Sequence, residues 1–187
     1  MNESFNLTKT AKEEGKKTHT GAMIAFILPA SVKKKIVLKK KDYPDDHDIQ
    51  DESKLHITLV YLGKANDLKD KKEQIVEVIK NFAEKENKVK GSISGVGRFN
   101  AKEDEPHPFY ASFDSGQLPK FREHLVDALS VIGVDIATNH GFSPHITVLY
   151  MPSDAETPKI VYPSIDMEFE CVTLSWAGEN YNFKLGV

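Results

Sequence analysis

The sequence predicts an α+β fold with two related lobes. Short strand-like stretches are mixed with two amphipathic helical stretches along 187 residues, which is typical of this class. One stretch occurs twice: residues 56–61 read HITLVY, and residues 145–150 read HITVLY. A repeat of this kind indicates two related structural units. Hydrophobic residues make up 40% of the chain, which is enough for a proper core.

Each element is predicted from hydrophobic periodicity and turn residues. We expect strands at residues 23–28, 55–62, 89–99, 109–113, 142–150, 167–176 and 181–185. Helical spacing of apolar residues predicts helices at residues 67–87 and 118–132. Ser31 is expected to cap a short helix that runs through the lysine-rich segment after it. Residues 41–53 predict an acidic loop.

The ends and the composition suggest how the chain is organised. Residues 1–19 are polar and lysine-rich, so we expect a tail, followed by one domain of residues 20–187. No apolar run approaches the roughly 18 residues of a membrane helix, and no secretory signal is evident. Together with a single cysteine, Cys171, these features predict a cytoplasmic protein.

The net charge of the protein limits the kinds of partner that it is expected to bind. A net charge of −3 and a pI of about 6.2 argue against binding to long DNA or RNA, but not against a local site for a small anion. The acidic cluster at residues 45–48 lacks the spacing of a zinc site, so we predict no metal and no cofactor.

The repeated strand places polar groups on one side. Side chains alternate faces along a strand, so His56 and Thr58 point one way, as do His145 and Thr147. If the lobes are related by a pseudo-twofold axis, these polar faces meet across a cleft. Packing alone would repeat only the aliphatic positions. The repeated polar positions therefore predict a functional site.

Two histidines and two threonines suit phosphodiester chemistry. Histidine titrates near neutral pH, so one imidazole can accept a proton while the other donates one. The threonine hydroxyls can hydrogen-bond the non-bridging phosphate oxygens as negative charge develops on them. No metal is needed for this scheme, and it predicts a bell-shaped dependence of rate on pH.

These residues resemble the 2H phosphoesterases, a superfamily named for two His-hydrophobic-Thr/Ser motifs. LHITLVYLG at residues 55–63 and FSPHITVLY at residues 142–150 fit both motifs and their flanks. HTGAMIAFILP at residues 19–29 and SWAGENYNFKLG at residues 175–186 look most like small phage-encoded members. The resemblance implies a bilobal fold of two pseudo-symmetric antiparallel sheets, backed by helices, with a central cleft. It also implies catalytic roles for His56, Thr58, His145 and Thr147.

We therefore predict a metal-independent phosphodiesterase that acts on a small nucleotide. The resemblance implies a cyclic oligonucleotide, a 2′,3′-cyclic phosphate or a 2′-5′ linkage, and a role against nucleotide-based anti-phage signalling. Two alternatives stay open: a non-catalytic nucleotide-binding sponge, and RNA end processing or 2′-5′ RNA ligation. We expect no membrane partner and a monomer.

Four aromatic residues are further candidates for substrate binding. Tyr61 and Tyr150 follow each threonine by three positions, so in regular strands they lie on the face opposite the histidines. Trp176 and Tyr181 lie near the C-terminal turn and could stack on a nucleobase. Ordinary strand packing explains Trp176 and Tyr181 equally well.

Overall fold

The computed structural model describes residues 20–102, 104–137 and 141–186, and the expected tail lies outside them. The strands within these ranges are β1 (Gly21–Ile27), β2 (Asp48–Ile49), β3 (His56–Lys64), β4 (Val89–Arg98), β5 (His107–Asp114), β6 (His145–Met151), β7 (Ile165–Phe169), β8 (Cys171–Trp176) and β9 (Glu179–Lys184). The α-helices there are α1 (Ala30–Ile36), α2 (Lys72–Lys85) and α3 (Leu118–Ser130). Short 3₁₀ helices lie at Lys40–Asp42, Glu52–Lys54 and Ala65–Lys71.

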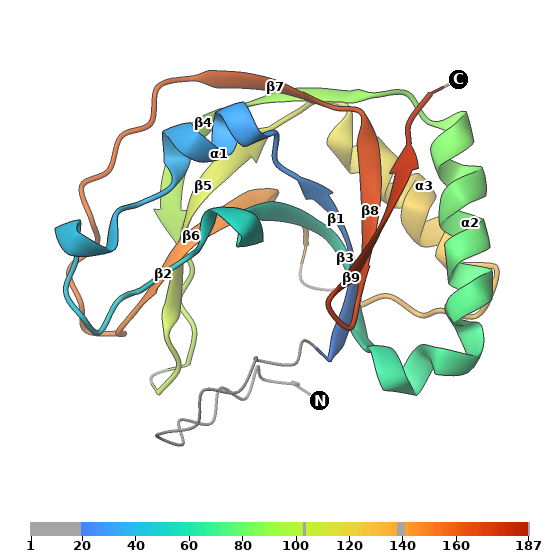
Figure 1. The fold of residues 1–187 in the computed structure, drawn as a ribbon, viewed down its shortest axis with the longest axis horizontal. Helices are drawn as coiled ribbons and strands as arrows, with labels where there is room; N and C mark the ends of the chain where they lie inside the picture. The colour runs from blue at the N-terminus through green and yellow to red at the C-terminus, as the bar shows by residue number, and fades with distance from the viewer. Residues whose placement is uncertain (1–19, 103, 138–140, 187) are drawn as a thin grey trace.

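These elements form two antiparallel sheets (Figure 1). The four-stranded sheet has the order β3-β1-β8-β9, and the five-stranded sheet has the order β2-β6-β5-β4-β7. Each sheet holds one copy of the repeated strand, β3 in the first and β6 in the second. The predicted α+β class and the two-lobed arrangement are confirmed.

The lobes are not consecutive halves of the chain. Residues 167–176 were expected to form one strand, but they are divided between β7, which pairs with β4, and β8, which pairs with β1. The chain therefore changes sheets at Glu170, and the C-terminal hairpin β8–β9 completes the sheet of the N-terminal strands. The crossing is visible at the top of Figure 1. The β-type sequence pattern is continuous across Glu170, so it did not indicate the change of sheet.

Two local predictions are wrong. Ser31 lies inside α1, and the residue before the helix is Pro29, which makes no side-chain capping bond. Proline fits this position because its fixed φ suits a helix start. The segment from residue 41 to 53 is not only a loop, since it contains β2, which pairs with β6. His47, in its acidic part, is buried and hydrogen-bonded to Asp46 at 2.7 Å.

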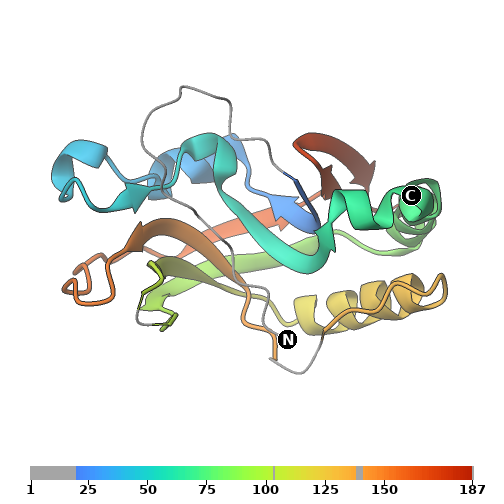
Figure 2. The same ribbon diagram turned by 90° about the horizontal axis from the view of Figure 1, so that it is seen from below.

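Helices α2 and α3 lie beside each other at one end of the sheets (Figure 2). Ile75, Ile79 and Phe82 of α2 are buried, as their helical spacing predicts. The region expected to be one helix from residue 67 begins instead as the 3₁₀ segment Ala65–Lys71. Within the described residues, no helix combines the length and the apolar character that crossing a bilayer requires.

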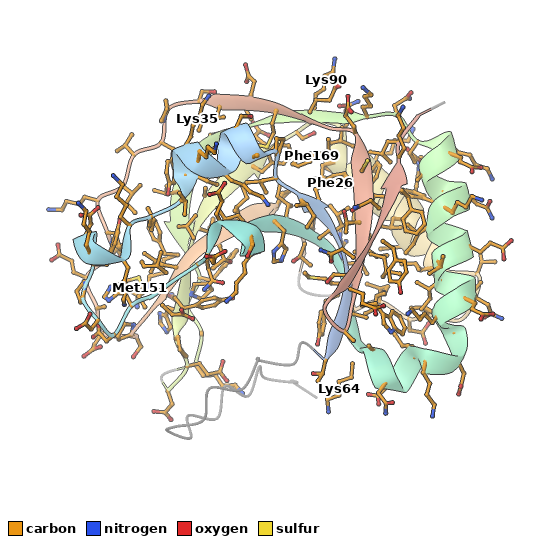
Figure 3. All side chains as sticks on the ribbon, in the orientation of Figure 1. Phe26, Lys35, Lys64, Lys90, Met151 and Phe169 are labelled. Carbon is orange, nitrogen blue, oxygen red and sulfur yellow. The ribbon has the colours of Figure 1, made fainter. Side chains whose placement is uncertain are left out.

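A chain of five phenylalanines joins the helices to both sheets. Phe26 of β1 stacks on Phe169 of β7, with ring centroids 4.4 Å apart, and contacts Phe121 of α3 at 5.3 Å. Phe121 also meets Phe82 of α2 at 5.0 Å, and Phe169 meets Phe113 of β5 at 5.6 Å. Figure 3 shows Phe26 and Phe169 directed toward each other in the interior. One core therefore fixes the two sheets relative to each other.

Replacing the ring at the centre of this chain tests that role. We expect Phe26→Ala to lower the free energy of unfolding by about 3–5 kcal/mol, because it leaves a cavity between the sheets. Urea unfolding followed by circular dichroism measures the change. Val161→Ala is the control, since Val161 is 91% exposed. A loss below about 1 kcal/mol in the first variant would show that the core closes without this ring.

Candidate active site

The two repeated strands lie next to each other in space. β3 is the edge strand of its sheet, and β6 lies between β2 and β5 in the other sheet. β3 and β6 contact each other directly and run close together in Figure 1. We call the surface that they present together the histidine face; it carries His56, Thr58, Tyr61, His145, Thr147 and Tyr150.

A β-bulge in each strand decides which side chains reach this face. In β3, Ala25 pairs with Thr58 and Ile24 pairs with Val60, so Leu59 has no partner in the register. Two consecutive residues, Leu59 and Val60, are consequently buried on the core side. A bulge adds one residue and reverses the alternation after it. Tyr61 therefore shares the face of the histidine.

The same irregularity occurs in β6. Tyr110 pairs with Thr147 and Phe109 pairs with Leu149, which leaves Val148 without a partner. Tyr150 thus returns to the side of His145. The expectation that Tyr61 and Tyr150 lie opposite the histidines is wrong, because it assumed regular strands. Nothing in the repeated hexapeptide itself marks the extra residue.

The two tyrosines have different surroundings. Tyr61 is 48% exposed, and its ring lies over Gly21, where an added Cβ would come within 3.4 Å of it. Tyr150 is hydrogen-bonded to Thr147, and burial raises the pKa of its hydroxyl. Tyr61 is therefore the more exposed of the two tyrosines, and Tyr150 is the more enclosed.

Each imidazole is oriented by its own strand. Nδ1 of His56 lies 2.5 Å from the carbonyl oxygen of Lys54, and Nδ1 of His145 lies 2.7 Å from that of Ser143. A carbonyl only accepts, so Nδ1 donates in both rings. In the neutral ring Nε2 is then the unprotonated nitrogen. Both histidines are thereby arranged to exchange protons through Nε2.

The site holds both histidines toward their neutral form. Burial lowers the pKa of His56, and His145 and Lys33 lower it further by electrostatic repulsion. Burial also lowers the pKa of His145. The repulsion means that the two rings are near enough for the charge of one to affect the other.

An aromatic pair adjoins only one histidine. Phe99 stacks on Tyr110 with centroids 4.3 Å apart, and the two rings contact His145 at 4.8 and 5.3 Å. Tyr110 lies close over Gly97, where an added Cβ would meet its hydroxyl oxygen at 2.5 Å. Glycines inside a strand are the signal that could have indicated this close approach. Sequence reasoning did not select Phe99 or Tyr110 as site residues.

Trp176 and Tyr181 do not join the histidines. Trp176 pairs with Ala22, and Tyr181 pairs with Leu174, on the side of the sheet that α2 covers. Lys72 of α2 hydrogen-bonds the Tyr181 hydroxyl at 2.9 Å and lies 5.7 Å from the centre of the Trp176 ring. Packing, and not stacking on a ligand at the histidine face, accounts for their positions.

Two surface hollows lie elsewhere on the molecule. One is lined by β4 and β7 beside Lys90 and Glu168, and the other lies between β2 and the segment that follows α1, beside His47. Neither includes His56 or His145. Among residues 20–102, 104–137 and 141–186, no three metal-ligating side chains gather as a metal site would require.

A fold of two antiparallel sheets, each presenting a His-x-Thr strand at a shared face, defines a two-histidine phosphoesterase class. Residues 30–172 match the family described as the AKAP7 2'5' RNA ligase-like domain. The chain belongs to this family, within the 2H phosphoesterase superfamily, which confirms the predicted superfamily. No match was found among curated proteins.

Solved structures share the fold at low sequence identity. TT0787 of Thermus thermophilus has a TM-score of 0.67 and 18% identity, covering 88% of this chain and 98% of that one. E. coli LigT complexed with 3'-AMP has a TM-score of 0.63 and 18% identity, covering 89% and 95%. The MHV ns2 PDE domain has a TM-score of 0.53 and 14% identity, covering 87% and 99%.

The lowered pKa of each histidine predicts how stability depends on pH. The unfolded state binds more protons below the ordinary value of about 6.5, so stability is full above that pH and falls as pH drops through the folded values. We expect ring-proton NMR titrations of His56 and His145 with midpoints below 6.5. His56→Gln and His145→Gln should each reduce the loss of stability between pH 7.5 and pH 5. Midpoints at or above 6.5 would contradict this assignment.

Proposed function

We propose that the protein is a phosphodiesterase that cleaves a small nucleotide phosphodiester by two-histidine acid–base catalysis. The observation that carries the proposal is the matched orientation of His56 and His145. Each ring donates Nδ1–H to a backbone carbonyl, and each belongs to a strand that also offers a threonine on the same face. Two such groups on one surface can serve as base and acid.

In this mechanism, one imidazole accepts a proton at Nε2 from the attacking water or ribose hydroxyl. The oxygen of that nucleophile forms a bond to phosphorus, and the bond from phosphorus to the leaving oxygen breaks. The other imidazole, protonated at Nε2, gives its proton to the leaving oxygen. Lys33 and His145 both disfavour a charge on His56, which favours His56 as the base and His145 as the acid.

A bound phosphate also helps to set the protonation states. Burial favours two neutral rings in the free protein. An anionic substrate favours the charged form of a nearby histidine, so binding raises the pKa of the ring that must act as acid. The ring that acts as acid therefore takes up the proton needed for catalysis when the substrate binds.

The threonines are proposed to stabilise the phosphoryl oxygens. Thr58 Oγ1 donates to the sulfur of Met23 at 3.9 Å. Thioether sulfur is a weak acceptor, so this hydroxyl is readily given up to a phosphate oxygen. Thr147 is hydrogen-bonded to Tyr150, which holds its hydroxyl on the histidine face. Each donor acts where negative charge develops.

Two observations support a nucleotide as the substrate. E. coli LigT, which shares the fold, has been solved complexed with 3'-AMP, NADP+ and ATP. In this chain, the Phe99–Tyr110 pair beside His145 is suited to receive a nucleobase by stacking. We propose a cyclic oligonucleotide, a 2′,3′-cyclic phosphate or a 2′-5′ linkage as the scissile group. Degrading such a signal would counteract anti-phage defence, as the likeness to small phage-encoded members implies.

The first test is turnover in excess EDTA, followed by chromatography. The substrates are 2′,3′-cyclic and 3′,5′-cyclic nucleotides, cyclic di- and trinucleotides, 2′-5′ oligoadenylate and RNA with a 2′,3′-cyclic end. We expect His56→Ala and His145→Ala each to lower kcat/KM by about 10²–10⁴-fold, because each removes a proton-transfer group. His124→Ala is the control, since His124 pairs with Glu86 at 2.7 Å on the helices.

The outcomes separate the alternatives. Loss of cleavage in both site variants, with the control unchanged, supports the two-histidine mechanism and names the substrate. Tight binding without cleavage by the wild type would favour a nucleotide sponge. Action on RNA ends alone would favour RNA end processing or ligation. Equal cleavage by the wild type and the site variants would refute the proposal.

The aromatic pair predicts a specific defect in substrate binding. Phe99→Leu should raise KM for a nucleotide by about 5–100-fold, since stacking on an aromatic ring is worth about 1–3 kcal/mol per base. The kcat should change less than about threefold, because His145 keeps its bond to Ser143. The control substrate is ribose 2′,3′-cyclic phosphate without a base. An equal rise in KM for both substrates would show that Phe99 does not contact the base.

A further inference from the structure

Arg122 of α3 reaches both histidine strands, although it is not itself on the histidine face. Its Nε donates to the carbonyl oxygen of Leu59 at 2.9 Å, and its guanidinium carbon lies 4.6 Å from the centre of the Phe142 ring. Leu59 belongs to β3, and Phe142 precedes β6. One side chain therefore links the two segments that carry the motifs.

The first contact is made at the bulge of β3. Leu59 has no register partner in β1, so its peptide group is displaced from the regular ladder. Arg122 supplies the donor for its carbonyl. The bulge in β6 is held in a comparable way, because Val148 accepts a hydrogen bond from the backbone N–H of Gln50 at 2.9 Å. The carbonyl of the bulge residue in β6 is therefore bound by the segment that continues its neighbouring strand β2, whereas that in β3 is bound by a side chain of α3.

The second contact lies beside the carbonyl that orients His145. Phe142 directly precedes Ser143, whose carbonyl accepts the Nδ1–H of His145. The backbone N–H of Phe113 binds the next carbonyl, that of Pro144, at 3.0 Å. By holding the Phe142 ring, Arg122 fixes the start of the segment that sets the direction of the imidazole.

We propose that Arg122 is a positioning residue that fixes both histidines at once, a role that rests on the function proposed above. It holds the bulge that follows Thr58 on one side and the irregular segment before His145 on the other. Burial lowers the pKa of Arg122, yet a guanidinium stays charged at neutral pH. Its planar group can donate at its edge while its face covers an aromatic ring, which the ammonium of lysine does not do.

The test compares Arg122→Lys and Arg122→Gln with Lys120→Gln, an exposed position on the same helix. On a substrate identified as above, we expect the Arg122 variants to lower kcat by about 100-fold with KM within about threefold. Misplacement of catalytic groups by about 1 Å has an effect of this size. Rates are normalised to the folded fraction measured by circular dichroism. Wild-type kcat in the folded fraction would limit Arg122 to a stabilising role and overturn the proposal.

A second readout does not depend on activity. Two-bond ¹H–¹⁵N NMR spectra report the tautomer and pKa of each histidine. We expect Arg122→Gln to shift both His56 and His145, with the Nδ1–H tautomer less populated, whereas Phe142→Leu should shift His145 alone. Unchanged spectra in Arg122→Gln would overturn the positioning role. If the wild type cleaves no substrate but both histidines still move in this variant, the proposed function fails and the positioning role stands.

Discussion

In both repeated strands, a histidine donates Nδ1–H to the carbonyl two residues earlier, and the site depends on this constraint. It fixes the tautomer of His56 and His145, so that in each neutral ring Nε2 is the unprotonated nitrogen. The bond is local, so each strand carries its own orienting group. What the fold adds is proximity, because β3 and β6 come from different sheets and meet only when the shared core is formed.

Proximity has an electrostatic consequence. Two partly buried imidazoles that repel each other are not easily protonated at the same time. The charge of Lys33 lowers the pKa of His56 further. A pair that resists double protonation while it awaits an anion is suited to exchange one proton across a phosphate. The surroundings also differ, since the rings of Phe99 and Tyr110 adjoin His145. The two strands therefore present the same His and Thr groups but different surroundings. In the proposed function, this difference would allow the site to distinguish one end of a substrate from the other.

The bulges at Leu59 and Val148 determine the composition of the histidine face. Without them, the face would carry two histidines and two threonines. With them, Tyr61 and Tyr150 are added, and two consecutive aliphatic residues in each strand are buried. A bulge interrupts the regular ladder, and the displaced carbonyls are held by Arg122 and by the backbone of Gln50. A side chain of α3 and the segment after β2 thus help to hold the bulges that determine which side chains lie on the histidine face.

The sequence alone determined the α+β class, the main strands and helices, and the His-Thr pairs, because these follow from local periodicity and from a repeat that packing does not require. It did not determine the sheet to which residues 165–176 belong, since a strand pattern records burial but not the identity of its partner. The face of the strand on which Tyr61 and Tyr150 lie depends on the two bulges. These bulges arise from the pairing of β3 with β1 and of β6 with β5. The register of the β8–β9 hairpin places Trp176 and Tyr181 against α2. Arg122, Phe99 and Tyr110 acquire their positions only through contacts between distant segments, so only the tertiary structure revealed them.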